Sequence, residues 1–302
     1  MVAARGLPRI LQYQRMIRPA VEARSLILPV TFGCSHGRCQ FCTINEGNPF
    51  RIRPLEDVKA DIDEVAGLSL PFNRVFITDG DALVVRHERL LEVLQYIRQR
   101  LPWVERVGIY GNAKDILRRT PAQLRELREH NLGIVYQGVE SGDDEVLATM
   151  EKGCTGQQQI EAGRRVREAG LLLSVTIVMG LGGVERSREH ALNTARVLTA
   201  MRPSSIRLHT VVVSPLAPLH RSWKEGRFIP PDVWGILTEV RLLLENVDLW
   251  DTPLIGNMKS NYLPLVGLLA NERQPLLDQV NVILETRDTS RLRAEAERAT
   301  QF

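Results

Sequence analysis

The 302-residue chain lacks the features that mark several protein classes. No apolar run reaches the roughly 20 residues that cross a bilayer, and the first residues lack the apolar core of a secretion signal. Lys and Arg number 39 against 36 Asp and Glu, and the basic residues are spread among acidic neighbours. We therefore predict a cytoplasmic protein that binds no membrane and is not built to bind nucleic acid.

Cysteine is also scarce, with four in the whole chain, yet three of them lie close together at Cys34, Cys39 and Cys42. Three is an odd number, and Cys154 is far along the chain, so disulfide pairing does not explain the group. In a reducing compartment, clustered thiols indicate metal ligands. We predict that these three thiolates converge on one metal centre.

Apolar, β-branched segments alternate with amphipathic ones along most of the chain. Strands are predicted over residues 25–31, 74–79, 104–110, 133–139, 171–179 and 205–213. Helices are predicted over residues 54–66, 88–100, 121–130, 144–150, 156–169 and 185–200. Six such units predict a parallel sheet with right-handed crossovers. The predicted fold class is α/β, a partial (β/α)6 TIM-like barrel with a C-terminal, mainly helical extension.

The alternation also sets the predicted domain limits. We expect an N-terminal extension over residues 1–24, the (β/α)6 core over 25–215, and an extension over 216–302 that closes the barrel. In the last part, helices are predicted at 230–245 and 274–284, an irregular loop at 250–268, and a charged tail at 287–302 that is either a short helix or frayed.

Polar residues and glycines follow five of the predicted strands. These segments are Cys34, residues 78–81, 110–112, 138–142 and 180–183. Active sites of parallel barrels are built at the carboxyl ends of the strands. We therefore expect these segments to gather on one rim.

Three kinds of site are compatible with the cysteine group. A zinc site would need His36 as fourth ligand, but a single residue separates it from Cys34, which makes a tight chelate. Buried structural cysteines have no reason to gather in one loop. A four-iron cubane held by three thiolates leaves one iron open for chemistry, and we favour this interpretation.

These residues resemble a known family. A strand ending in Gly33-Cys34, a three-cysteine loop with Phe41 before its last cysteine, and the (β/α) body look like the radical S-adenosylmethionine (radical SAM) superfamily. The likeness covers about residues 25–215. The usual cysteine spacing there is three residues and then two, whereas this chain has four and then two. The resemblance implies a [4Fe–4S] cluster on the three cysteines, with S-adenosyl-L-methionine at the open iron.

The resemblance also implies which residues hold S-adenosylmethionine. The segment after the second strand would meet the methionine amino group, and Lys152 stands where a basic residue, more often Arg, pairs with the carboxylate. The implied cofactor-binding residues are Phe41, Asp79, Gly80, Asp81, Asn112, Glu140, Ser141, Lys152, Thr176 and Gly180. Plainer interpretations exist: the aspartates as solvated loop acids or helix caps, Lys152 as a solvent lysine, and the glycines at 180–183 as a tight strand-to-helix turn.

Unusual polar residues at the rim and in the extension are candidates for substrate contacts. They are His36, Tyr110, Lys114, Arg207, His209, Asn261 and Tyr262, the last two within the run 259–262. Arg51 and Arg53 follow the cysteine loop and are either anion ligands or structural ion-pair partners. No catalytic residue beyond the cluster is assigned.

The function that the resemblance implies is that of a radical SAM enzyme. One electron from a flavodoxin or ferredoxin would drive cleavage of S-adenosylmethionine to methionine and a 5′-deoxyadenosyl radical, which takes a hydrogen atom from a substrate. Cys154 alone cannot hold a second cluster, and neither a cobalamin unit nor an RNA-binding appendage is visible, so we expect a small organic substrate. Two alternatives remain: a haem or cluster chaperone of the same superfamily, and a zinc-binding α/β protein.

Overall fold

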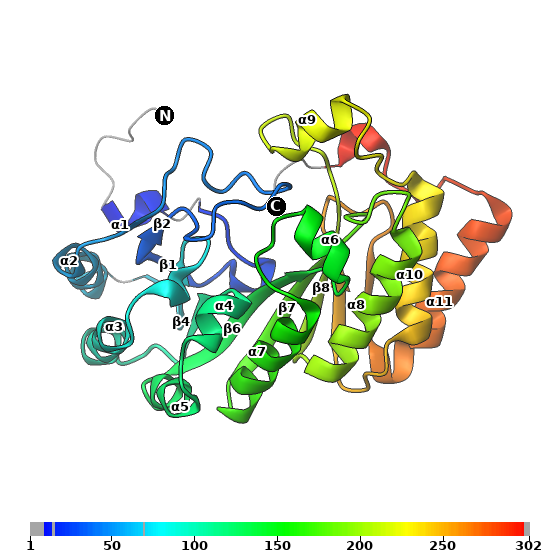
Figure 1. Cartoon of the computed structure of the whole chain (residues 1–302). Helices are drawn as coiled ribbons and strands as arrows, with labels where there is room; N and C mark the ends of the chain where they lie inside the picture. Colours follow the sequence, from blue (N-terminus) through cyan, green and yellow to red (C-terminus); the bar gives the residue numbers. More distant parts are fainter. Residues whose placement is uncertain (1–8, 14–15, 69, 299–302) are drawn as a thin grey trace. The chain divides into compact units, whose positions relative to one another are not determined.

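A computed structural model describes residues 9–13, 16–68 and 70–298 (Figure 1). The first eight residues, for which no secretion signal is predicted, and the last four of the predicted tail lie outside these ranges. The chain divides into two compact units. Unit 1 comprises residues 1–37, 44–136 and 165–172, and unit 2 comprises 38–43, 137–164 and 173–302.

Unit 1 is built on parallel strands. Their order is β1 (Leu26–Pro29), β4 (Arg74–Thr78), β5 (Arg106–Tyr110) and the first part of β6 (Leu132–Glu140). The short strands β2 (Thr31–Phe32) and β3 (Arg51–Ile52) form a separate antiparallel pair. Its helical segments are α1 (Arg9–Gln12), η2 (Ala20–Glu22), α2 (Leu55–Ala66), η3 (Ala82–Val84), α3 (His87–Arg100), α4 (Ala113–Leu117) and α5 (Pro121–Glu129).

Local sequence explains these elements. Strands β1 and β4 are almost continuously buried, as expected of parallel strands covered on both faces. Helix α5 begins with a capping box between Thr120 and Gln123 and has Pro121 in its first turn, where the missing N–H costs nothing. Alternate residues of the strands meet in one apolar cluster that contains Ile27, Phe76 and Tyr136.

Unit 2 contains the end of β6 and a second group of strands. Strand β7 (Leu172–Met179) pairs in parallel with β8 (Ser205–Thr210), β8 pairs in parallel with β9 (Pro253–Gly256), and β10 (Leu265–Leu268) pairs antiparallel with β9. Helix α10 (Val233–Asn246) packs against α8 (Ser187–Met201) and α11 (Leu269–Thr286) (Figure 1). The remaining helical segments are α6 (Asp144–Thr149), most of α7 (Gly156–Glu168), α9 (Leu219–Lys224) and η4 (Glu295–Glu297).

The predicted α/β fold class is confirmed. Each of the six predicted strands is present, and helices separate them in the order of a partial (β/α)6 TIM-like barrel. No helix in the described part of the chain is long and apolar enough to cross a membrane. The predicted domain limits stay a prediction.

Some sequence-based predictions were wrong in detail. Residues 250–268 do not form one irregular loop, because β9 and β10 lie within them and extend the sheet of unit 2 beyond β8. The sixth strand ends at Thr210 rather than at residue 213, and α11 begins at Leu269, before residue 274. Pro275 lies in the second turn of α11, where it cannot donate the helical hydrogen bond to the carbonyl of residue 271. The short helices α4 and α9 were not predicted.

A buried carboxylate ties η2 to the strands of unit 1. Glu22 has no exposed surface and accepts hydrogen bonds from the hydroxyls of Ser25 and Tyr136. It also forms an ion pair with Arg106, 2.7 Å away. A buried carboxylate is tolerated only when its oxygens are satisfied in this way.

We predict that Tyr136→Phe lowers the free energy of unfolding by about 1–3 kcal/mol, since it removes one hydrogen bond to a buried charge. Urea denaturation measures the change. Tyr262→Phe is the matched control, because its hydroxyl bonds Glu295 at an exposed position, and it should have a much smaller effect. Equal decreases in the free energy of unfolding of the two variants would show that the buried contact with Glu22 stabilises the fold no more than an exposed hydrogen bond.

Candidate functional site

The loop that carries Cys34 is held by two asparagines in unit 1. The Cys34 N–H donates to Asn45 Oδ1 at 2.6 Å, and Asn45 Nδ2 donates back to the Cys34 carbonyl at 3.0 Å. Asn48 donates to Asp79, which also accepts from the N–H groups of Gly33 at 3.1 Å and Gly80 at 2.8 Å. The cysteine loop and the segment after β4 are thus joined by hydrogen bonds.

Gly80 is required at its position by the close approach of Cys34. A Cβ at residue 80 would lie 2.8 Å from Cys34 Cβ, closer than real Cβ contacts allow. Two of the five segments predicted to gather on one rim, Cys34 and residues 78–81, therefore lie against each other in unit 1. Burial is the main cause that raises the pKa of Asp79 above its ordinary value.

Asp81 is fully buried at the carboxyl end of the same segment. Its Oδ2 accepts from the Ser35 hydroxyl and from Asn112 Nδ2, each at 2.6 Å. Burial, and then the neighbouring Asp115, raise the pKa of Asp81 to about 8. The structure thus brings two predicted cofactor residues, Asp81 and Asn112, into contact. Asp81 makes no side-chain cap to η3, so it does not serve as the helix cap that the plainer interpretation supposed.

In unit 2, Phe41 lies between two of the cysteines and inside an apolar cluster. Phe41 is 8% exposed and packs with Met150, Val178 and Val211, and Cys39 and Cys42 pack against the same cluster. Backbone hydrogen bonds fix the segment: the Gln40 N–H donates to the Met150 carbonyl at 3.0 Å, and the Gln40 carbonyl accepts from Leu219 at 2.7 Å.

Glu140 and Lys152 form an ion pair at the end of β6. Lys152 Nζ lies 3.1 Å from Glu140 Oε1, and both side chains are 12% exposed. Burial alone would lower the pKa of Lys152, but the Glu140 carboxylate, followed by Cys39 and Cys154, holds that pKa above its ordinary value. The interpretation of Lys152 as a solvent lysine is therefore wrong.

The Glu140–Lys152 pair depends on a glycine. A Cβ at Gly138 would collide with the Glu140 carboxylate and lie 3.0 Å from Lys152 Nζ. Glu140 itself has a positive φ of 63°, an uncommon conformation for a residue with a side chain. The backbone thus turns sharply where the carboxylate is presented, which is a frequent property of functional positions.

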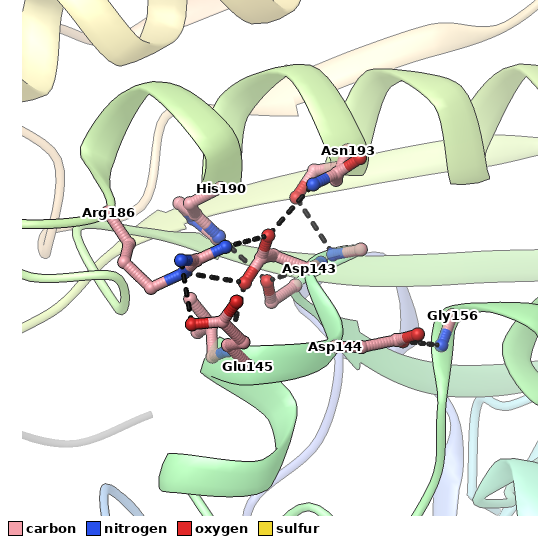
Figure 2. A network of polar contacts seen from close by, with 11 residues as sticks. Asp143, Asp144, Glu145, Gly156, Arg186, His190 and Asn193 are labelled. Carbon is pink, nitrogen blue, oxygen red and sulfur yellow. Dashed lines mark hydrogen bonds and ion pairs between the residues drawn. The ribbon is translucent and has the colours of Figure 1, made fainter.

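The turn after Glu140 is fixed by Asp143, whose carboxylate is the centre of the network in Figure 2. Arg186 donates to both Asp143 oxygens, at 3.0 and 2.9 Å, and Asn193 donates to one of them at 2.8 Å. Asp143 also caps α6 through the Val146 N–H at 3.0 Å. Burial would raise the pKa of Asp143, but the hydrogen bonds from Arg186, then the Val146 N–H, then Asn193 hold that pKa below its ordinary value.

Ser141 and Gly180 are held by buried polar groups of unit 2. The Ser141 hydroxyl lies 2.8 Å from His190 Nδ1, and burial lowers the pKa of His190 to about 4. The Gly180 N–H donates to Glu239 Oε2 at 2.6 Å. Burial raises the pKa of Glu239 to about 7, although bonds from Ser187 and Gly180 oppose this.

The predicted substrate residues differ in their surroundings. Arg207 and His209 are buried side by side on β8, whereas Lys114 is exposed on α4. Tyr110 packs edge-on against Phe76 in the apolar cluster of unit 1, and the half-buried His36 lies in the cysteine loop.

The run 259–262 braces the sheet of unit 2. The Asn261 amide donates to the Leu208 and Gly256 carbonyls and accepts from Thr210, so its polar atoms are all engaged. Tyr262 donates to Glu295 at 2.6 Å. Substrate roles for these two residues stay predictions.

Arg51 and Arg53 have structural partners. The Arg51 guanidinium lies over the Phe32 ring at 4.2 Å, and Arg53 forms a buried 2.7 Å ion pair with Asp61. The structural interpretation therefore accounts for Arg53.

The sequence patterns did not indicate several residues that hold Asp143 and Gly180 in place. Arg186, Asn193 and Glu239 act on segments more than 40 residues away in the chain, so local patterns do not reveal them. Asp143 could have been found as a capping residue, because it precedes a predicted helix. Asn45 gave only a weak signal, as one of several polar residues after the cysteine loop.

The donor set suits a thiolate-bound cluster. No disulfide joins the cysteines in the described ranges, and all four are partly buried thiols. Thiolates are the ligands of iron–sulfur clusters, and three of them leave one iron of a cubane open. Among the described residues, no group of three or more His, Cys, Asp or Glu side chains is arranged as a ready metal site.

Comparison with known proteins identifies the family. Residues 28–195 match the family model described as the radical SAM superfamily, and the chain belongs to this superfamily. Enzymes of the superfamily use a [4Fe–4S] cluster and S-adenosylmethionine. The prediction of a radical SAM enzyme is thereby confirmed at the level of the family, which favours iron–sulfur over zinc.

Two kinds of relative illustrate the extent of the likeness. The tRNA-2-methylthio-N(6)-dimethylallyladenosine synthase of Bordetella avium is 25% identical over 188 residues, which cover 59% of this chain and 39% of that protein. The chain thus spans well under half of that relative. The structure of methylornithine synthase matches with a TM-score of 0.52 at 16% identity, covering 85% of this chain and 80% of the other. This second likeness shows the fold.

The buried Glu239 gives a pH-dependent prediction. Its carboxyl is ordinarily half-protonated near pH 4.5 and near 7 in the folded chain, so the folded state binds more protons between these values. Its contribution to stability is complete below about pH 4.5 and is lost as the pH rises through 7. Glu239→Gln removes this loss, so its stability relative to wild type should rise by about 2–3 kcal/mol from pH 5 to pH 8.

Thermal unfolding of both proteins across this pH range measures the effect. The exposed Glu56→Gln is the control, and its difference from wild type should not change with pH over that range. A pH-independent difference for Glu239→Gln as well would contradict the raised pKa.

Proposed function

We propose that this chain is a radical SAM enzyme that takes a hydrogen atom from a small organic substrate. The observation that carries the proposal is the cysteine trio at positions 34, 39 and 42, in a chain that belongs to the superfamily. When bound, the cluster supplies the electron with which S-adenosylmethionine is cleaved to methionine and a 5′-deoxyadenosyl radical. A flavodoxin or ferredoxin is the proposed electron donor.

In this proposal the protein binds the cluster, orients S-adenosylmethionine, and shields the radical from water. Cys34, Cys39 and Cys42 are the cluster ligands, and the Asn45 and Gln40 contacts hold their loop. Phe41 is placed within an apolar cluster, where an aromatic face suits the adenine ring. An enclosed apolar surface also excludes water and side reactions from a reactive species.

Glu140 and Lys152 are proposed to hold the methionine part of the cofactor. A bound amino acid carries one ammonium and one carboxylate, and this pair offers one charge of each sign at the end of β6. Both side chains are mostly buried, so their interactions with a ligand are weakly screened. In unit 1, Asp79, Gly80 and Asp81 are the second proposed contact, next to the Cys34 loop.

The proposed substrate class, a small organic molecule, differs from that of the Bordetella relative, whose name refers to tRNA. The chain carries 39 basic and 36 acidic residues, a balance that does not favour a polyanionic substrate. Only Cys154 lies outside the trio, and its thiol pKa is raised by burial, which makes it a poor metal ligand. A small organic substrate fits these properties better.

A chaperone of haem or clusters would share this body without the reaction. Incubation of the reconstituted, dithionite-reduced protein with S-adenosylmethionine separates the two hypotheses. The proposal expects methionine and 5′-deoxyadenosine to form together, even slowly and without substrate. A loaded protein that leaves S-adenosylmethionine intact would favour the chaperone.

The ligand set is tested by single substitutions. Cys34→Ala, Cys39→Ala and Cys42→Ala should each abolish cluster assembly, because two thiolates do not hold a cubane stably, whereas Cys154→Ala should retain full iron content. Iron and sulfide analysis after anaerobic reconstitution gives the answer. Iron loading that depends on Cys154, or stoichiometric zinc in the purified protein, would show that the ligand set is wrong.

Lys152 is tested through cofactor affinity. Lys152→Met should weaken the binding of S-adenosylmethionine to the reconstituted protein by about 1–3 kcal/mol, or about 5- to 150-fold, through loss of a charge-assisted bond. Lys152→Arg should retain most of the affinity, and the exposed Lys224→Met should match wild type. Equilibrium binding is the measurement. An unchanged dissociation constant in Lys152→Met would remove this residue from the cofactor site.

A further inference from the structure

Arg207 is a buried cation that lacks a counter-ion within the described residues. Its side chain lies on β8, and the residue is only 8% exposed. Its one hydrogen bond is a long contact of 3.5 Å from Nη1 to the Thr176 hydroxyl, and its Nε is buried without a hydrogen-bond partner. In the part of the chain that the structure describes, no carboxylate forms an ion pair with it.

Arg53 shows how this chain otherwise buries a guanidinium. That residue is 4% exposed, and its Nη1 lies 2.7 Å from both the Asp61 carboxylate and the Pro29 carbonyl. A guanidinium cannot shed its proton in a protein, so burial leaves it charged. An unpaired buried charge lowers the stability of the folded protein by several kcal/mol. A protein tolerates such a charge where the charged group binds a ligand.

The position of Arg207 points to the substrate space. In the parallel register, Arg207 pairs with Thr176 and His209 pairs with Val178, so these four side chains share one face of the two strands. Val178 belongs to the apolar cluster that contains Phe41, from the cysteine loop. Arg207 therefore lies on the same face as the loop that carries two of the cluster ligands.

The position of Arg207 along β8 also places it near the Phe41 cluster. Val211, four residues further along the chain, reaches the Phe41 cluster. Val178 of the same cluster pairs with His209, two residues along β8 from Arg207, so Arg207 lies about 7 Å along the strand from this apolar cluster. A ligand bound there would lie next to Thr176 and beside the Phe41 cluster.

The neighbouring groups limit the charge of the ligand. Burial, and then Arg207 itself, lower the pKa of His209 to about 3, so the imidazole is neutral and adds no positive charge. Among the described residues, the hydrogen-bond partner of Arg207 is the neutral Thr176 hydroxyl. One guanidinium matches a single negative charge, and its planar fork suits the two oxygens of a carboxylate.

We propose that Arg207 anchors the carboxylate of the substrate, so that the enzyme acts on a small organic monocarboxylate or on one carboxylate arm of a larger molecule. Thr176 and His209 lie beside Arg207 on this face and are the proposed hydrogen-bonding neighbours of the carboxylate, so Thr176 is assigned to the substrate rather than to the cofactor, to which the family resemblance assigned it. This inference rests on the proposed function, but its main tests do not require cluster or turnover.

The first test is the stability of the full-length protein without added ligand. Arg207→Met removes an unpaired buried charge and retains volume, so its midpoint of thermal unfolding should equal or exceed that of wild type. Arg53→Met should lower the midpoint, because it removes the ion pair between Arg53 and the buried Asp61. A marked fall for Arg207→Met would show that the residue is structural, and would overturn the proposal.

The second test is anion binding. Sodium acetate, propionate or benzoate is added to the protein in increasing amounts, and sodium chloride keeps the ionic strength constant and serves as the control salt. Thermal unfolding is the readout. At least one carboxylate should raise the wild-type midpoint by about 2–4 °C at tenfold excess over its dissociation constant. The rise should be absent in Arg207→Met and retained in the exposed Arg227→Met. No carboxylate-specific rise in wild type, or an equal rise in Arg207→Met, would overturn the assignment.

A third measurement separates this inference from the proposed function. The affinity of the reconstituted protein for S-adenosylmethionine should be the same in wild type and Arg207→Met, while it falls in Lys152→Met. A comparable fall in Arg207→Met would assign Arg207 to the cofactor carboxylate and overturn its substrate role, with the proposed enzyme class intact. A protein that binds no S-adenosylmethionine at all would instead contradict the proposed function.

Discussion

The interaction on which the proposed site depends is the largely buried ion pair between Glu140 and Lys152. It requires a glycine at position 138 and a positive φ at Glu140. It also requires the turn after Glu140, which is fixed by the hydrogen bonds that Arg186 and Asn193 donate to the Asp143 carboxylate. A buried charge pair alone is weak support for stability. The amount of structure that serves this one pair is better explained by the need to present both charges to a ligand.

Polar groups are treated in two ways in this chain. Glu22 and Asp143 are buried carboxylates that accept hydrogen bonds from arginine side chains, as structural carboxylates must. Arg207 and one oxygen of Glu239 are buried without such partners in the described residues. Such groups cost stability, and we propose that Arg207 serves binding and that Glu239 serves the placement of Gly180.

The sequence predicted much of this account because its strongest signals are local. The cysteine trio, the six strands and the closeness of Glu140 and Lys152, twelve residues apart, could all be found in short segments. The structure depends elsewhere on distant partners, such as Arg186 for Asp143 and Glu239 for Gly180, which no local pattern encodes. Strands β9 and β10 were missed because each has only four residues, in a segment rich in Gly, Pro, Asn and Ser whose pairing is set by its neighbours.

The central claim is that three thiolates hold a cluster whose open iron binds S-adenosylmethionine. Electron paramagnetic resonance of the reconstituted, dithionite-reduced protein tests it most directly, with spectra recorded before and after addition of S-adenosylmethionine. The account predicts a reduced [4Fe–4S] signal whose shape changes on addition, because the cofactor becomes an iron ligand. A fully formed cluster whose signal stays unchanged at saturating S-adenosylmethionine would contradict it.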